Sequence, residues 1–473
     1  MGKADDRFDV VVVGGGTAGL TAALAARHEG ASVALCEREG RLGGDCTFYG
    51  CVPSKTLIEV AQVVQDARRL AEAGLLDRAP QPAFSKVAEH VARTVASIAR
   101  DERDERFTNA GIEVVYGDAR FTGSHEVVVG SRTLIAERFV IATGSEPAIP
   151  PVAGLETLDY LTNRSVFDLR ELPARLVVLG GGPIGLELAQ AFQRLGSVVH
   201  VVEMADRLLP RDEPEAGELA LDVLESEGVA IHLSAEARSV RRENAETVVE
   251  TSAATLSCDA LLVATGRRGA TADIGLARLG VATASAGYVE VDDRCRTVAD
   301  HVFAAGDVTG GLQFTHVASH EGAVAGRNAA GGRAKRDERV APWVTFLDPE
   351  IAHVGLTESE ARARYGEIRV AHYPMSHVDR ARIEGKAVGF VKLVIRKRPI
   401  IGWTGGGELV GAQIVGPRAG ELIQECALAM RTRAFTGRLA QTIHPYPAMT
   451  LSVQQAASQL FPLGRVLVEN DEL

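Results

Sequence analysis

One motif occurs twice in this 473-residue chain, and it constrains the fold more than any other feature. Residues 8–39 read FDVVVVGGGTAGLTAALAARHEGASVALCERE, and residues 175–205 read RLVVLGGGPIGLELAQAFQRLGSVVHVVEMA. Each copy begins with a β-branched apolar run, passes through a glycine cluster and continues with a helical apolar pattern. Each copy therefore predicts a strand, a glycine turn, a helix and a second strand that ends in a carboxylate.

The glycines of each copy have distinct physical tasks. The first permits a tight turn, the second lets the backbone approach a pyrophosphate, and the third allows close packing of helix on strand. These glycines are Gly14, Gly16 and Gly19 in the first copy and Gly180, Gly182 and Gly185 in the second. The closing carboxylates, Glu37 and Glu203, would accept hydrogen bonds from a ribose diol. Two such motifs predict two dinucleotide-binding folds.

Three shorter segments suggest how the two folds are interleaved. FVIATGS and LLVATGR each join a strand to Ala-Thr-Gly, and HVFAAGD ends at Asp307, just outside a buried strand. Ligands bind at this end of the strands in open parallel sheets. After the polar linker 334–341, strands of an antiparallel kind and two helices follow. We predict an α/β protein with two interleaved Rossmann-like domains and an α+β C-terminal domain.

Composition narrows the classes of function. Apolar residues make up 46% of the chain and charged residues 24%, which is typical of soluble globular proteins. The net charge of −11 disfavours nucleic acid and anionic membranes as partners, because both attract basic surfaces. The N-terminus MGKADDRFDVVVVGGG is too acidic for a signal peptide, and no segment reaches the roughly 20 apolar residues of a membrane span. We expect a cytoplasmic protein.

Two of the six cysteines are close enough in sequence to suggest chemistry. Cys46 and Cys51 lie in the segment GGDCTFYGCVPSK. Their spacing in a regular helix means a rise of roughly 7–8 Å, whereas the Cα atoms of a disulfide usually lie within about 6.8 Å. The pair can bridge only if the turn is tightened or non-helical, and Gly43, Gly44 and Gly50 supply that freedom. The residues alone leave a strained, easily reduced disulfide or two unpaired cysteines as alternatives.

A resemblance to a known family favours the disulfide. The twin glycine motifs with GGDCTFYGCVPSK, ATGS, ATGR, AAGDV and DPEIAHVGLTE resemble the pyridine nucleotide–disulfide oxidoreductases. That family includes lipoamide dehydrogenase, glutathione reductase and mercuric reductase. The resemblance covers nearly the whole chain and implies electron flow from a nicotinamide through FAD to a disulfide. It implies an FAD domain at 1–150 and 268–338, an NAD(P) domain at 151–267 and a dimerisation domain at 339–473.

The resemblance also implies residue roles. Cys51 would be the thiol that faces the flavin and Cys46 the thiol that faces the substrate, with Lys55 near the flavin and paired with Glu187. Glu37 would bind the adenosine ribose and Asp307 the ribityl chain. Further cofactor contacts would come from Gly44, Ala142, Thr143, Gly144 and Gly266. A carboxylate at Glu203 favours NAD(H) over NADP(H), although Arg207 could soften that preference.

The family pattern breaks in the segment QTIHPYPAMTLS. One register gives His444 the position of the family's acid–base histidine but leaves Met449 where a glutamate should follow. The other, which we prefer, keeps the final helix in phase and gives these positions to Tyr446 and Leu451. A tyrosine, with a pKa near 10, mostly donates hydrogen bonds at neutral pH. A second departure is Asp45, whose carboxylate would disfavour a thiolate on Cys46.

These features predict an enzyme that passes electrons from NAD(P)H through FAD and Cys46–Cys51 to an unidentified small molecule or metal ion. It would resemble mercuric reductase or dihydrolipoamide dehydrogenase but lack the His/Glu acid–base pair. We expect no resident metal site and a homodimer whose active site is shared across the interface. No cysteine follows Cys426, although mercuric reductases usually carry a paired-cysteine tail. The alternative is a flavoprotein redox sensor or partner-binding protein with a structural or regulatory disulfide.

Overall fold

The computed structural model describes residues 6–244 and 246–461. Predictions about the first five residues and the tail after residue 461 fall outside these ranges. Contacts divide the chain into two compact units, Met1–Pro173 with Ala260–Glu338 and Ala174–Asp259 with Arg339–Leu473. The predicted assignment of cofactors to residues 1–150, 151–267 and 268–338 stays a prediction.

The first unit is built on a seven-stranded sheet in the order β3-β2-β1-β6-β5-β4, with β16 also paired to β6. The parallel strands of this sheet are β1 (Arg7–Val13), β2 (Val33–Glu37), β3 (Ile112–Tyr116), β6 (Arg132–Ile141) and β16 (Val302–Ala304). The antiparallel strands are β4 (Ala119–Gly123) and β5 (Glu126–Val129). Val10, Val11 and Val12 of β1 have no exposed surface, as expected for a parallel strand covered on both faces.

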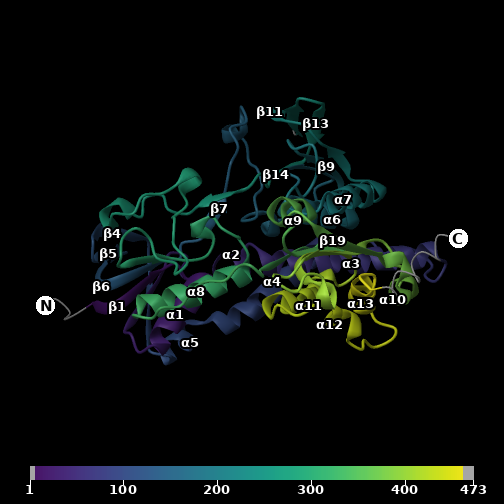
Figure 1. Cartoon of the computed structure of the whole chain (residues 1–473). Helices are drawn as coiled ribbons and strands as arrows, with labels where there is room; N and C mark the ends of the chain where they lie inside the picture. Colours follow the sequence, from purple (N-terminus) through teal and green to yellow (C-terminus); the bar gives the residue numbers. More distant parts are fainter. Residues whose placement is uncertain (1–5, 245, 462–473) are drawn as a thin grey trace. The chain divides into compact units, whose positions relative to one another are not determined.

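Two helices of the first unit, α1 (Thr17–His28) and α8 (Thr315–Ala329), lie side by side (Figure 1). A Cβ atom on Gly322 would lie 2.3 Å from the carbonyl oxygen of Ala18, and one on Gly326 would lie 2.1 Å from that of Ala22. Only glycine permits so close an approach, which fixes α8 against the helix that follows the first glycine turn.

The first unit also contains further helices and short strands. The helices are α2 (Gly44–Phe48), α3 (Cys51–Glu72), α4 (Phe84–Ala99) and α5 (Asp104–Asn109). The short strands β7 (Ser145–Pro147) and β15 (Arg267–Gly269) pair antiparallel, and β14 (Ala260–Val263) precedes β15. The described part of this unit contains no helix long and apolar enough to span a membrane, and neither does that of the second unit.

The second unit repeats the strand–turn–helix–strand plan. Parallel strands β8 (Arg175–Leu179), β9 (Val198–Val202) and β10 (Ala230–His232) carry helices α6 (Pro183–Leu195) and α7 (Pro214–Ser226). An antiparallel sheet follows, formed by β11 (Ala237–Glu243), β12 (Glu246–Thr251) and β13 (Thr255–Cys258).

The C-terminal part of the second unit is a five-stranded antiparallel sheet in the order β17-β18-β21-β20-β19, which confirms the predicted α+β architecture. Its strands are β17 (Pro342–Thr345), β18 (Glu350–Gly355), β19 (Ile368–Pro374), β20 (Phe390–Arg396) and β21 (Glu408–Gly416). Its helices are α9 (Glu358–Tyr365), α10 (Asp379–Ile383), α11 (Ala419–Arg431), α12 (Thr436–Gln441) and α13 (Leu451–Ser458).

One buried charge cluster ties the two segments of the second unit together. The ammonium group of Lys392 on β20 lies 3.1 Å from Glu213, 3.0 Å from Glu215 and 2.9 Å from Glu358. Glu213 and Glu215 lie at the start of α7, and Glu358 begins α9. The lysine therefore joins residues 174–259 to the C-terminal sheet.

Candidate active site

The first glycine turn has the geometry that the sequence predicts. Gly14 has a φ of +113°, and a Cβ atom there would lie 2.1 Å from the carbonyl oxygen of Ala142. A Cβ atom on Gly19 would lie 1.8 Å from the carbonyl oxygen of Gly14. Glu37 closes the turn, because its carboxylate accepts the N–H groups of Gly15 at 2.7 Å and Glu39 at 2.8 Å.

A cavity of about 340 Å³ opens beside this turn. Gly14, Glu37, Arg38 and Thr143 are among the residues that line it. The Thr143 hydroxyl oxygen is buried and has no hydrogen-bond partner within residues 6–244 and 246–461. Buried polar atoms usually have partners, so an orphaned hydroxyl beside a glycine turn and a carboxylate fits a bound dinucleotide.

Four further predicted cofactor residues of the first unit are Gly44, Gly144, Gly266 and Asp307. A Cβ atom on Gly44 would lie 2.7 Å from the Cα atom of Gly16, so the cysteine loop packs directly on the turn. Gly144 and Gly266 adopt positive φ angles of +73° and +126°. Asp307 lies beyond the end of β16, and its carboxylate accepts the Ser145 hydroxyl at 2.6 Å.

The second glycine turn reproduces the first. A Cβ atom on Gly185 would lie 2.1 Å from the carbonyl oxygen of Gly180, and Gly182 precedes α6. The Glu203 carboxylate accepts the N–H groups of Gly181 at 2.6 Å and Ala205 at 2.7 Å. A fixed carboxylate thus stands at the end of β9, as Glu37 does at the end of β2.

The segment between Cys46 and Cys51 is not one continuous helix, as a disulfide at this spacing would require. Helix α2 ends at Phe48 and α3 begins at Cys51, and both Cys46 and Cys51 carry thiols. Thr315, the first residue of α8, brings its hydroxyl oxygen to 3.2 Å from the sulfur of Cys46 and 3.3 Å from that of Cys51. Hydrogen bonding to Cys51 and burial raise the pKa of the Cys46 thiol far above its usual range, while the Thr315 hydroxyl acts in the opposite direction.

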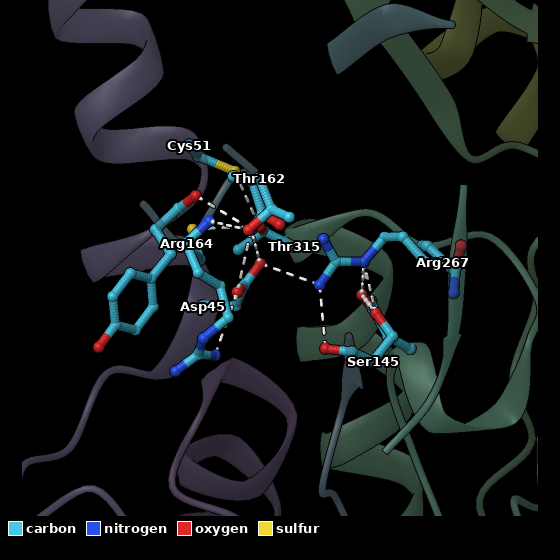
Figure 2. Close-up of polar contacts among 12 residues, drawn as sticks. Asp45, Cys51, Ser145, Thr162, Arg164, Arg267 and Thr315 are labelled. Atoms are coloured by element: carbon cyan, nitrogen blue, oxygen red, sulfur yellow. Dashed lines mark hydrogen bonds and ion pairs between the residues drawn. The ribbon is translucent and has the colours of Figure 1, made fainter. Parts of the chain in front are cut away.

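Asp45 points into a group of cationic and amide side chains (Figure 2). Its carboxylate lies 3.0 Å from the Arg267 guanidinium and 3.3 Å from the Asn163 amide nitrogen, and Arg164 lies at 3.8 Å. These partners offset the negative charge beside Cys46. The expectation that Asp45 simply disfavours a thiolate is therefore incomplete, because the sequence did not reveal its partners.

Arg267 connects Asp45 to the predicted FAD residue Asp307. Its guanidinium donates to the Ser145 hydroxyl at 2.6 Å and lies 3.7 Å from the Asp307 carboxylate. Arg267 was not among the predicted site residues, although it directly follows Gly266 in the ATGR motif. The motif was the signal that could have found it.

Lys55 and Glu187 belong to different units. Lys55 lies on α3, four residues after Cys51, and Glu187 is buried on α6, where its carboxylate accepts the Phe346 N–H at 2.8 Å. Their predicted pairing stays a prediction.

His444 and Tyr446 each have a carboxylate partner. The His444 ring is 6% exposed, with Nδ1 at 2.9 Å from the Thr442 carbonyl oxygen and Nε2 at 3.1 Å from Glu425. Tyr446 is 73% exposed and donates its phenol to Asp379 at 2.9 Å, a hydrogen bond that raises the pKa of Tyr446. Spacing could not reveal Glu425 or Asp379, because they lie 19 and 67 residues away.

Comparisons with known proteins agree with this geometry. Residues 8–322 match the family described as pyridine nucleotide-disulphide oxidoreductase, and residues 341–457 match its dimerisation domain. The mercuric reductase of Shewanella putrefaciens is 36% identical over 95% of this chain and 80% of its own length. That of Streptomyces lividans is 34% identical over 97% of both.

Solved structures have the same fold. A Cu(II) complex of the HOCl-induced flavoprotein disulfide reductase RclA from Escherichia coli superposes with a TM-score of 0.85 at 29% identity, covering 96% of this chain and all of the other. LpdA from Mycobacterium tuberculosis superposes with a TM-score of 0.86 at 30% identity, covering 96% of this chain and 99% of the other. The chain belongs to the pyridine nucleotide–disulfide oxidoreductase family and is an NAD(P)H-dependent, FAD-containing oxidoreductase with a disulfide redox centre.

Proposed function

We propose that this enzyme transfers electrons from NADH, through FAD and the Cys46–Cys51 pair, to a thiophilic metal ion such as Hg(II) or Cu(II). The observation that carries the proposal is the position of both sulfurs against the single hydroxyl of Thr315. Two sulfurs so close can share a bond or bind one soft ion. Thiolates are preferred donors for soft metals.

The surroundings of His444 and Tyr446 favour a metal ion over a disulfide substrate. Exchange with a disulfide releases a thiolate, which a general acid helps to protonate, and such help is worth roughly 10²–10⁴-fold. Both nitrogens of His444 face acceptor oxygens, and the Tyr446 phenol donates to Asp379. A metal ion that takes up electrons leaves no thiolate in need of a proton.

The relatives support the same acceptor class. Several that are 32–36% identical are mercuric reductases, and the RclA structure is a Cu(II) complex. Lipoamide, the substrate of dihydrolipoamide dehydrogenase, is a disulfide. Its reduction needs acid–base help, whereas His444 and the Tyr446 phenol are already engaged with other acceptor oxygens.

The Glu203 carboxylate supports NADH as the electron donor. Two backbone N–H groups hold it at the end of β9, where it would accept the ribose hydroxyls of NADH and repel the 2′-phosphate of NADPH. Arg207, which could counter this, donates instead to the Pro210 carbonyl oxygen at 2.5 Å.

Other residues would hold and orient FAD, which when bound accepts a hydride from the nicotinamide and passes the electron pair onward. Glu37 would bind the adenosine ribose, Thr143 and Asp307 would donate or accept hydrogen bonds along the cofactor, and Lys55 would lie near the ring, paired with Glu187. Opening of the Cys46–Cys51 bond by an electron pair leaves one thiolate and, with one proton, one thiol. We also propose a homodimer, formed through the dimerisation domain, that completes the active site.

Oxidation of NADH by the purified enzyme in the presence of Hg(II), Cu(II), glutathione disulfide or lipoamide tests the proposal. We expect turnover with a metal ion and little with either disulfide. Cys46→Ser should abolish the metal-dependent turnover while FAD stays bound, and Cys426→Ala, a change at a buried cysteine outside the site, should not. Full turnover by Cys46→Ser would contradict the proposal and favour a regulatory role for the cysteines.

A further inference from the structure

The Thr315 hydroxyl lies within hydrogen-bonding distance of both cysteine sulfurs. It donates to the sulfur of Cys46 at 3.2 Å and lies 3.3 Å from the sulfur of Cys51. A hydroxyl carries one donor and two acceptor sites. It can therefore donate to one sulfur while it accepts the S–H of the other.

The fold holds this hydroxyl firmly in place. Thr315 is the first residue of α8, and no side-chain hydrogen bond caps that helix, so the hydroxyl is not engaged in capping. Gly322 and Gly326 fix α8 against α1. One turn after Thr315, the Ser319 hydroxyl lies 3.3 Å from that of Thr21 on α1. The start of a 15-residue helix also carries partial positive charge, which favours an anion nearby.

We propose that Thr315 is a catalytic residue whose hydroxyl stabilises the reduced Cys46–Cys51 pair by hydrogen bonding to the sulfur that carries negative charge. This inference rests on the proposed role of the two cysteines as the redox pair. A hydrogen bond to a charged acceptor is roughly twice as strong as one between neutral groups. A neutral disulfide sulfur accepts only weakly, so the hydroxyl favours the reduced pair over the disulfide.

This preference shifts the electron pair from the flavin toward the two cysteines. When the sulfur–sulfur bond takes up two electrons and one proton, it yields a thiol and a thiolate, and the Thr315 hydroxyl accepts from the first and donates to the second. No imidazole is needed for this arrangement. The His444 ring nitrogens and the Tyr446 phenol already face other acceptor oxygens. Thr315 therefore supplies part of the hydrogen bonding that stabilises the thiolate.

Anaerobic reduction of the holoenzyme tests the inference through the long-wavelength absorbance of a thiolate beside oxidised flavin. We expect Thr315→Val to shift the equilibrium from reduced sulfurs toward reduced flavin by about tenfold, which is about 30 mV for a two-electron couple. Thr315→Ser retains the hydroxyl and should behave like the wild type. Ser319→Ala removes a hydroxyl from the same helix without touching the sulfurs and should also change nothing.

A second measurement tests the inference even if the Thr315→Val variant loses FAD. Equilibration with glutathione redox buffers, followed by alkylation and mass spectrometry, gives the reduction potential of Cys46–Cys51 without the flavin signal. A valine variant with the wild-type potential would overturn the role of Thr315. Absence of the thiolate band from the wild type would instead overturn the proposed redox pair, so the two failures are distinguishable.

Discussion

Replacement of Lys392 by methionine should destabilise the second unit strongly. Its side chain is 5% exposed and lies within 3.1 Å of three carboxylates, of which Glu213 is 4% exposed. These hydrogen bonds raise the pKa of Lys392 although burial alone would lower it. Methionine fills a similar volume, so the main loss is the positive charge among the three acids.

The expected loss follows from the uncompensated charge. Removal of one partner from a buried ion pair costs about 3–5 kcal/mol, because the remaining charge stays out of water. Glu213 keeps one other donor, the N–H of Glu358 at 2.5 Å, which places the expected loss toward the lower end of that range. Adding Glu213→Gln to the Lys392→Met variant should recover part of the lost stability, because the second change removes one of the unpaired negative charges.

Urea unfolding followed by tryptophan fluorescence measures this effect. The chain has two tryptophans, Trp343 and Trp403, and both belong to the second unit. Lys397→Met is the matched control, because Lys397 pairs with Glu367 at the surface, where an ion pair is worth about 0–1 kcal/mol. Equal losses for Lys392→Met and Lys397→Met would refute the reasoning.

Three further predictions concern the active site and pH. Tyr446→His should raise the rate of NADH-linked reduction of glutathione disulfide by about 10²-fold, the low end of general acid–base effects. The reason is that Asp379 could orient the new imidazole. An unchanged rate would argue against a missing base. Glu203→Ala should move the kcat/KM ratio toward NADPH by about fivefold, because two unit charges about 4 Å apart in water interact by about 1 kcal/mol. An unaltered ratio would exclude Glu203 from cofactor selection. Burial raises the pKa of Glu321 to about 7. The folded state then binds more protons than the unfolded state between about pH 4.3 and 7, so stability should fall as pH rises through that window. Glu321→Gln should weaken this dependence of stability on pH. The measurement is the midpoint of urea unfolding at several pH values, followed by the release of FAD.

The amino-acid sequence by itself determined the elements whose requirements are local. A positive φ at Gly14 and the close approach of Gly19 to the Gly14 carbonyl oxygen can be met only by glycine, so the motif predicted both turns and the closing carboxylates. The break between α2 and α3 also followed from local glycines and the spacing of the two cysteines.

Only the tertiary structure decided which side chains meet around the sulfurs. Thr315 lies 269 residues from Cys46 in the chain and reaches it because α8 packs on α1. Asp45 likewise meets Arg267 and Asn163, which lie 222 and 118 residues away in the chain. No periodicity or spacing encodes such contacts, because each depends on two distant backbones that the packed core brings together.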